Sequence, residues 1–296
     1  MRALCYALVW GGLLMQPAFA ACEGVAPEQK LQNTFAQDIG RGLDKIIEDG
    51  WIEVALYDDF APWSSIQDGQ AVGVDVDIAH LIGDTLGVDT RIRLVAAGEN
   101  LDADLRNYIW KGAVVNGRVS DVMLHVPYDV SYACRFDQVV FTGLYAQEHL
   151  AIAYDLTHYP DADEKPTPAY FRFDTVGVEN DSISDFYLTS FGKGAASGGV
   201  RRFRTTTLAV DAMTAHEVMA VMGPRAELEA AMKQGQSLHQ PPMPGLAKSN
   251  WTLGAALSFQ HRPLSYAVED ALFQAVQDGR IKAIFAQHGL SYDAPQ

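Results

Sequence analysis

The feature that most constrains the fold of this chain is a repeated alternation of strand-like and helix-like segments. Short apolar runs alternate with longer stretches in which apolar residues recur every three or four positions. A first series of such segments occupies 52–57, 74–87, 91–97, 99–112 and 121–125. The order strand, helix, strand, helix, strand predicts a parallel sheet whose strands are joined by right-handed helical crossovers.

A second series surrounds and follows a proline-rich, acidic segment at 156–170, which predicts a surface loop. Its predicted strands and helices are 149–155, 175–179, 182–191, 207–215, 217–222, 224–235, 251–259 and 264–289. We therefore expect an α/β protein of two lobes, with mostly parallel sheets, flanking helices and two hinge strands. The expected boundaries give lobe 1 as 51–150 plus 251–296 and lobe 2 as 151–250, after an N-terminal lead-in at 21–50.

Residues 1–20 have the pattern of a secretory signal peptide. Arg2 is their only charge, an apolar run follows, and Ala18 and Ala20 supply an A-x-A cleavage site. The apolar run is too short to span a membrane, and no later stretch reaches the roughly 18 apolar residues of a membrane helix. We therefore expect a protein exported to the periplasm, without a membrane span.

The cysteines leave the state of the mature N-terminus open. Removal of the signal peptide removes Cys5 and leaves Cys22 and Cys134. An oxidising compartment permits a disulfide between these two, and lipidation of Cys22 or a free thiol are the alternatives.

Charge and motifs exclude several classes of function. The formal net charge is −15, whereas nucleic-acid binding depends on Lys and Arg that neutralise phosphates. HEVMA at 216–220 lacks the second His of a zinc-protease helix, the glycines at 192–199 do not match a dinucleotide-binding loop, and no G-x-S-x-G surrounds Ser197. We expect a monomer with no cofactor, no metal and no nucleic-acid partner.

The segment DVMLHVPYDVSYACRFDQVVF at 121–141 begins as a buried strand and then changes character. His125, Pro127 and Tyr128 stand where the strand should leave its sheet. Open parallel sheets bind ligands beyond the carboxyl ends of their strands, so His125 and Tyr128 are candidate ligand contacts. A hydrogen-bonded structural histidine and a packed loop tyrosine are the alternatives.

In this order, several segments resemble the periplasmic solute-binding proteins of the amino-acid ABC-transporter class (family 3), from about residue 50 to the C-terminus. The segments that carry the resemblance are IEVALYDDFAPW, GVDVDIAHLIGDTLGV, DVMLHVPYDVSYACRFDQVVFTGLY, TVGVENDSISDFYL and ALFQAVQDGRIKAIFAQHGL. The resemblance implies two lobes that close on a small-molecule ligand by a hinge, and an ABC permease as partner.

The resemblance also implies roles for individual residues. Arg135 falls where the family places the arginine that binds a ligand carboxylate, although it could instead pair with Asp129 or Asp137. Phe60 or Trp63 falls where an aromatic ring packs over the ligand.

In the second lobe, the resemblance places Ser182 in the loop that binds an anionic or polar group, beside a helix N-terminus. Glu179 ends a strand of that lobe, and it faces either the cleft or solvent.

Three departures from the family pattern bear on the ligand. Tyr57 and Tyr132 stand where the family has an acid and a threonine, and no acid stands near Gly223 and Pro224, where the family binds an α-amino group. A protonated amine without a carboxylate partner is costly to bury. The sequence therefore predicts a small polar or carboxylated ligand, and not a standard α-amino acid.

The sequence leaves two other functions as alternatives. The HVPYD loop and the LRNYIWKG helix resemble a divergent branch that accompanies periplasmic quinoprotein (PQQ-dependent) alcohol dehydrogenases and their cytochrome c, as in methanol oxidation. Such an accessory protein would have a cleft filled by its own side chains, for example Tyr57, Tyr128 or Tyr132. A dehydratase-type enzyme is the third hypothesis, with Glu179 as its only candidate acid, but we expect no enzyme.

Overall fold

The structure is a computed structural model, and it describes residues 39–114, 117–161 and 164–296. The predicted signal peptide and Cys22 lie outside the described residues, whereas Cys134 is disulfide-bonded. Within the described ranges, no helix combines the length and the apolar character needed to cross a membrane.

The first group of elements, called lobe 1 below, surrounds strands in the spatial order β4, β1, β5, β11 and the first part of β6. Strands β4 and β5 pair in parallel with β1, and β11 pairs antiparallel with β5 and β6. The strands of this lobe are β1 (Trp51–Tyr57), β2 (Ser65–Gln67), β3 (Gln70–Val72), β4 (Asp89–Val95), β5 (Val122–Tyr128), β6 (Val139–Asp155) and β11 (Asn250–Ser258).

Helices cover both faces of the lobe 1 sheet. Val54 and Leu56 of β1 pack with α2, α8 and α9, while Ala55 between them packs with the opposite layer of α3 and η1. A strand buried on both faces reads as a continuous apolar run, which is why β1 was predictable. The helices are α1 (Leu43–Asp49), α2 (Val74–Leu86), α3 (Leu101–Leu105), η1 (Arg106–Trp110), α4 (Val130–Ala133), η3 (Phe259–His261), α8 (Arg262–Gln277) and α9 (Arg280–Gln287).

The second group, called lobe 2, surrounds the parallel strands β8, β7 and β9, to which the second part of β6 adds antiparallel. One face packs against α5, and the other face packs against α6 and α7. The elements of this lobe are η2 (Pro168–Arg172), β7 (Val176–Glu179), α5 (Ile183–Gly194), β8 (Val200–Phe203), α6 (Thr206–Thr214), β9 (Ala220–Pro224), α7 (Arg225–Ala231) and β10 (Gln236–His239).

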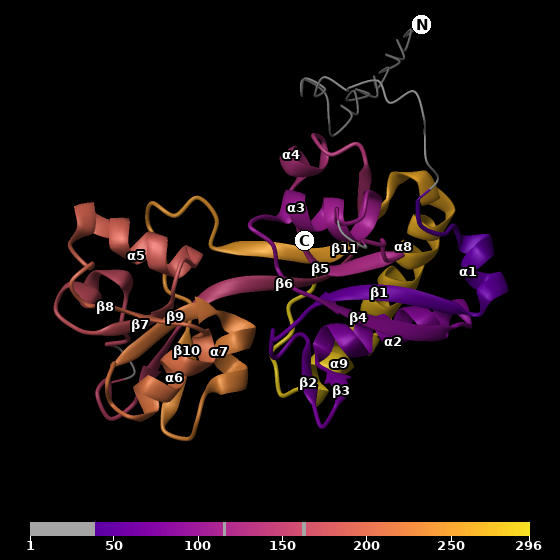
Figure 1. The fold of residues 1–296 in the computed structure, drawn as a ribbon. Coiled ribbons are helices and arrows are strands. Elements are labelled where there is room, and N and C mark those ends of the chain that lie inside the picture. The colour runs from indigo at the N-terminus through magenta and orange to yellow at the C-terminus, as the bar shows by residue number, and fades with distance from the viewer. Residues whose placement is uncertain (1–38, 115–116, 162–163) are drawn as a thin grey trace, which may run out of the picture.

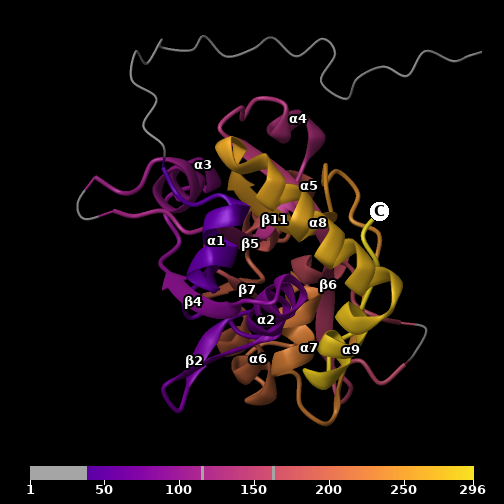
Figure 2. The ribbon, with the colours of Figure 1, turned by 90° about the vertical axis from the view of Figure 1, so that its right-hand side faces the viewer.

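Strand β6 belongs to both lobes. It pairs with β11 as far as His149 and with β9 from Leu150 onward, so it changes partner between these two residues. The hydrogen-bonded path from β4 to β8 is therefore continuous through this one strand. Figure 1 shows the two groups side by side, with β6 extending from one into the other. Figure 2, turned to face lobe 1, shows α1, α2, α8 and α9 in front of the strands.

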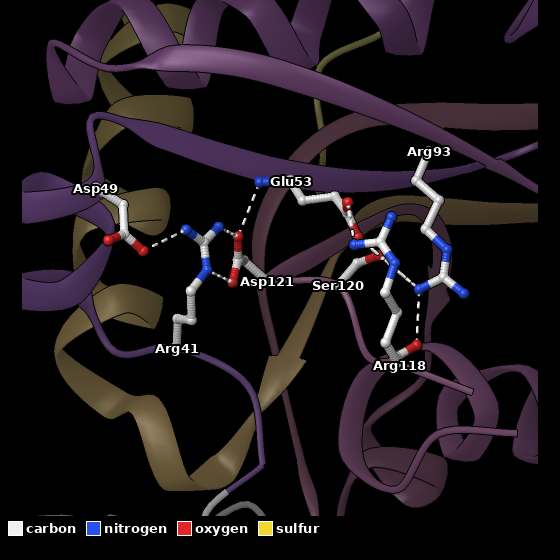
Figure 3. A network of polar contacts seen from close by, with 7 residues as sticks. All are labelled: Arg41, Asp49, Glu53, Arg93, Arg118, Ser120 and Asp121. Carbon is white, nitrogen blue, oxygen red and sulfur yellow. Dashed lines mark hydrogen bonds and ion pairs between the residues drawn. The ribbon is translucent and has the colours of Figure 1, made fainter. Parts of the chain in front are cut away.

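A network of charged residues holds the N-terminal helix α1 on lobe 1 (Figure 3). Arg41 donates to Asp49 at 3.1 Å and binds Asp121 with two nitrogens, of which Nε lies 3.2 Å from the carboxylate. The carboxylate of Asp121 also accepts from the main-chain N–H of Glu53 at 2.8 Å, which ties β5 to β1. The Trp51 ring lies between the guanidinium groups of Arg41 and Arg91. Residues 39–49 are thus part of lobe 1, in contrast to the separate lead-in that we expected.

Candidate functional site

A cavity of about 220 Å³ lies between the two lobes and is lined by side chains from both. Its lining residues are Phe60, Trp63, His125, Glu148, Leu150, Glu179, Ser182, Ile183, Ser184, Thr206, Met222, Gly223, Pro224, Glu227 and Trp251. Many of them stand at or just beyond the carboxyl ends of the parallel strands β1, β7 and β9. This is the position at which α/β sheets bind small molecules.

The lobe 1 wall of the cavity is aromatic. Phe60 and Trp63 come from the loop after β1, and Trp251 comes from the hinge strand β11. The first N–H groups of α2 hold this loop in place, since Val74 donates to the carbonyl of Pro62 and Asp75 to that of Trp63.

Gly73 allows the close contact between this loop and α2. Its φ is +136°, and a Cβ at this position would lie 2.2 Å from the Trp63 carbonyl oxygen. No other residue type avoids both the strain and the overlap.

His125 stands in the same wall, at an irregularity in β5. Its φ is +60°, in the left-handed region, and the pairing of β5 with β11 shifts register at this level. Such irregularities change the direction in which a side chain points. Here the His125 ring contacts the rings of Phe60 and Trp63, with centroid separations of 4.9 and 4.5 Å. The strand itself continues to Tyr128, so the prediction that it ends at His125 was wrong.

A buried carboxylate orients the His125 ring. Asp75 of α2 is 1% exposed; its carboxylate lies 2.9 Å from Nδ1 of His125 and accepts from the Tyr145 hydroxyl at 2.8 Å. The Tyr145 hydroxyl in turn accepts from the main-chain N–H of His125, and burial raises the pKa of Tyr145 well above its usual value. With Nδ1 donating to Asp75, Nε2 of a neutral His125 is a hydrogen-bond acceptor.

Three glutamates face the cavity from the hinge and from lobe 2. Glu148 of β6 is 2% exposed; one of its oxygens accepts from the His149 N–H, and the other has no hydrogen-bond partner among the described residues. Glu179, at the end of β7, accepts from the N–H and the hydroxyl of Thr206 at 3.0 and 3.1 Å. Glu227 lies in the first turn of α7.

The three carboxyl groups interact electrostatically. Burial, followed by the negative charges of Glu179 and Glu148, raises the pKa of Glu227 to about 8, against the opposing effect of the Thr206 hydroxyl. Burial also raises the pKa of Glu148, against the effects of the His149 N–H and the Arg225 charge. Among the described residues that line the cavity there is no Lys or Arg, so its charged side chains are acids.

Five of the seven predicted site residues line this one cavity, namely Phe60, Trp63, His125, Glu179 and Ser182. Ser182 also caps α5, since its hydroxyl accepts from the N–H of Asp185 at 3.2 Å. Tyr128 and Arg135 are not among the lining residues.

Tyr128 and Arg135 lie outside the cavity because of the paths that β5 and α4 take. Because β5 continues past the cavity, Tyr128 pairs with Thr252 of β11, and α4 carries Arg135 away to an exposed position near the Tyr132 ring. Tyr57 and Tyr132 also lie off the cavity, where their hydroxyls donate to Asp104 and Asp102 respectively.

Sequence reasoning missed Glu148, Glu227 and Trp251. The expectation that no acid stands near Gly223 and Pro224 overlooked Glu227, which the first turn of α7 brings back to the cavity. Glu148 and Trp251 belong to the hinge strands, where the two lobes meet. The available signal was an acid close to the apolar run LAIAY at 150–154, within the same strand.

The described residues contain no group of three or more His, Cys, Asp or Glu side chains arranged to hold a metal ion. Chemically, the cavity therefore offers an aromatic wall, hydrogen-bond acceptors and a few main-chain and hydroxyl donors. Such a composition can bind and orient a small polar molecule.

The fold is that of a two-lobed solute-binding protein. No protein-family model and no curated protein sequence matches the chain. Solved structures do match it: an ancestral cationic amino acid solute-binding protein (AncCDT-1) aligns with a TM-score of 0.67 at 18% identity, over 83% of this chain and 98% of that one.

Two further structures of this kind are similar. An amino acid ABC transporter substrate-binding protein from Streptococcus pneumoniae, bound to L-arginine, has a TM-score of 0.60 at 17% identity over 85% of this chain and 98% of its own. The second substrate-binding domain of GlnP from Lactococcus lactis, in an open conformation, has a TM-score of 0.59 at 20% identity over 83% and 97%. These likenesses confirm the predicted fold class. The narrower resemblance to the quinoprotein-associated branch is not confirmed.

Proposed function

We propose that this chain is an exported solute-binding protein that captures a small solute between its two lobes and delivers it to an ABC-type importer in the membrane. The mature protein begins after a cleaved signal peptide and acts in the periplasm as a monomer. It binds its ligand without changing it chemically, and lobe closure about β6 and β11 buries the ligand.

The observation that carries this proposal is the composition of the cavity wall. Lobe 1 supplies Phe60, Trp63 and His125, and lobe 2 supplies Glu179 and Glu227, so neither lobe alone forms the site. A ligand that touches both walls stabilises the closed arrangement, as hinge-type binding proteins require.

The cavity gives little support to the carboxylated ligand that the sequence predicted. Arg135 is not in its wall, and no other guanidinium or ammonium group lines it within the described residues. We therefore retain the small polar ligand and assign no ligand role to Arg135.

The accessory function receives no support from the cavity. The accessory-protein hypothesis predicted a cleft filled by tyrosines, yet Tyr57, Tyr128 and Tyr132 are not among the residues that line the cavity. The enzymatic alternative needs an acid free to transfer a proton, whereas Glu179 is held by two hydrogen bonds from Thr206 at the start of α6.

A thermal-shift screen of residues 21–296 against amines, amino acids, sugars and organic acids tests the proposal. We expect one class of solute to raise the melting temperature by several degrees, because a ligand at 100 times its Kd stabilises the folded state by about 2.7 kcal/mol. Ile183→Trp should abolish the shift by filling the cavity, and Leu208→Trp should not, since Ile183 lines the cavity and the similarly exposed Leu208 does not. An equal shift in both variants would place the ligand elsewhere.

A further inference from the structure

We infer that the solute is a small organic cation, carrying one or two ammonium or guanidinium groups on an apolar body and no carboxylate. This inference rests on the proposed function, because it concerns the ligand of the same cavity.

The first argument is the sign of the charged groups around the cavity. Glu148, Glu179 and Glu227 enter it from three different elements, and no Lys or Arg of the described residues balances them in the lining. Arg225 is not in the lining, and although its charge acts on Glu148, it is bound to Asp293 at 2.5 Å. A cationic ligand would favour the ionised form of these carboxyl groups, whereas an anion would add to the repulsion between them.

The second argument is the unused acceptor capacity. One oxygen of Glu148 is buried without a hydrogen-bond partner among the described residues, and Nε2 of a neutral His125 is an acceptor when Nδ1 donates to Asp75. Buried polar groups in proteins are normally hydrogen-bonded, so we expect the ligand to supply a hydrogen-bond donor to these atoms. An ammonium group has three N–H donors and no acceptor.

The third argument concerns the helix N-termini, which are the alternative anchors for an anion. Each of the three that approach the cavity already has a carboxylate close to it. Asp185 lies in the first turn of α5, Glu179 accepts from the Thr206 N–H at the start of α6, and Glu227 lies in the first turn of α7. An anion at any of these helix starts would lie close to one of these carboxyl groups, which makes the helix starts poor anion sites.

The remaining hydroxyl at that end of the cavity is Ser184, whose Oγ is buried without a partner among the described residues. A hydroxyl can accept as well as donate, and it therefore also suits an N–H group of the ligand.

The fourth argument is the separation of apolar and acidic surface. Phe60, Trp63 and Trp251 form the wall on the lobe 1 side, and the glutamates belong to the hinge and lobe 2. A molecule with an alkyl body and a charged end can lie with its body on the rings and its cation against the acids. Aromatic faces attract cations as well as alkyl groups, which favours the same ligand.

A matched series of five-carbon probes tests the inference on the mature protein by calorimetric titration. We expect n-pentylamine and 1,5-diaminopentane to bind, and 5-aminopentanoate to bind at least tenfold more weakly because its carboxylate enters an acidic cavity. Pentan-1-ol and pentanoate should not bind measurably. Tighter binding of pentanoate or 5-aminopentanoate than of n-pentylamine would overturn the inference.

L-arginine and the wider metabolite panel separate this inference from the proposed function. If L-arginine or another carboxylate-bearing solute binds and no simple amine does, the inference fails and the solute-binding function stands. If no probe and no panel member binds, both fail.

Variants of the acids identify the groups involved. Glu148→Gln and Glu227→Gln keep the side-chain volume and should each weaken n-pentylamine binding by at least tenfold. Glu229→Gln is the matched control, because Glu229 lies on the same helix but accepts from the Ser291 N–H outside the cavity. Equal affinity in Glu227→Gln, Glu148→Gln and the control would contradict the inference, provided that circular dichroism shows all three folded.

Discussion

At the scale of single residues, the cavity concentrates carboxyl groups that burial and mutual repulsion disfavour as anions. Glu227 shows this most clearly, since its pKa rises from an ordinary 4.5 to about 8. An acid with a raised pKa holds its proton more tightly in the folded protein than in the unfolded chain. Its contribution to stability is therefore lost as the pH rises from about 4.5 to about 8. A binding site that buries an acid in this way gives up stability above the pKa of that acid.

Glu227→Gln should therefore stabilise the protein without ligand in a pH-dependent way. Glutamine remains neutral, so the variant should melt at about the same temperature as the original protein near pH 5, and about 3 °C or more above it at pH 8, where about 2–4 °C corresponds to 1 kcal/mol. Differential scanning calorimetry at several pH values measures this. The exposed Glu217→Gln serves as control. A constant difference across the pH range would show that Glu227 does not titrate abnormally.

At the scale of secondary-structure elements, periodicity predicted most of the chain. The strand β1 and the helix α2 were predicted within a residue of their ends, because a doubly buried strand and an amphipathic helix leave strong patterns. The region at 99–112 departs from expectation: α3 ends at Leu105 and a π-helical turn follows. Periodicity does not distinguish a π-turn from an α-helix, since both bury Leu105 and Ile109.

The candidate site was less predictable than the elements, for reasons of tertiary geometry. Phe60 and Trp63 follow a strand end and were found by that rule, whereas Glu148 and Trp251 reach the cavity from within strands that cross between lobes. Arg135 was assigned from a resemblance, and the longer course of β5 and the short helix α4 place it elsewhere. A sequence pattern shows which face of an element is apolar but not where two lobes meet.

The attachment of α1 to lobe 1 provides a test at the element scale. Asp121→Asn should lower the free energy of unfolding by about 2–3 kcal/mol, because it removes the more buried of the two carboxylates that bind the mostly buried Arg41. Urea unfolding followed by circular dichroism measures the loss. Lys45→Ala breaks only surface ion pairs with Glu48 and Asp49 and should cost much less. Equal costs for the two variants would mean that the network does not hold α1.

At the scale of the whole molecule, several connections join the two lobes. Strands β6 and β11 cross between them, and the C-terminal segment bridges them as well. Tyr292 of that segment donates to the Tyr145 carbonyl of lobe 1, while Asp293 binds Arg225 of lobe 2. Glu148 of β6 and Trp251 of β11 line the cavity, so a ligand bound there acts directly on the strands that relate the lobes.

The position of the ligand is best tested by tryptophan fluorescence. Of the tryptophans after residue 20, Trp63 and Trp251 line the cavity, whereas Trp51 stacks between two arginines at the far end of β1 and Trp110 ends the π-helical turn. The variant Trp51→Phe/Trp110→Phe keeps only the two cavity tryptophans. It should be titrated with whichever of n-pentylamine and L-arginine raises the melting temperature more. We predict the same change in emission, at the same Kd, as in the original protein. Loss of the emission change with retained calorimetric binding would show that the solute binds outside the cavity between the lobes.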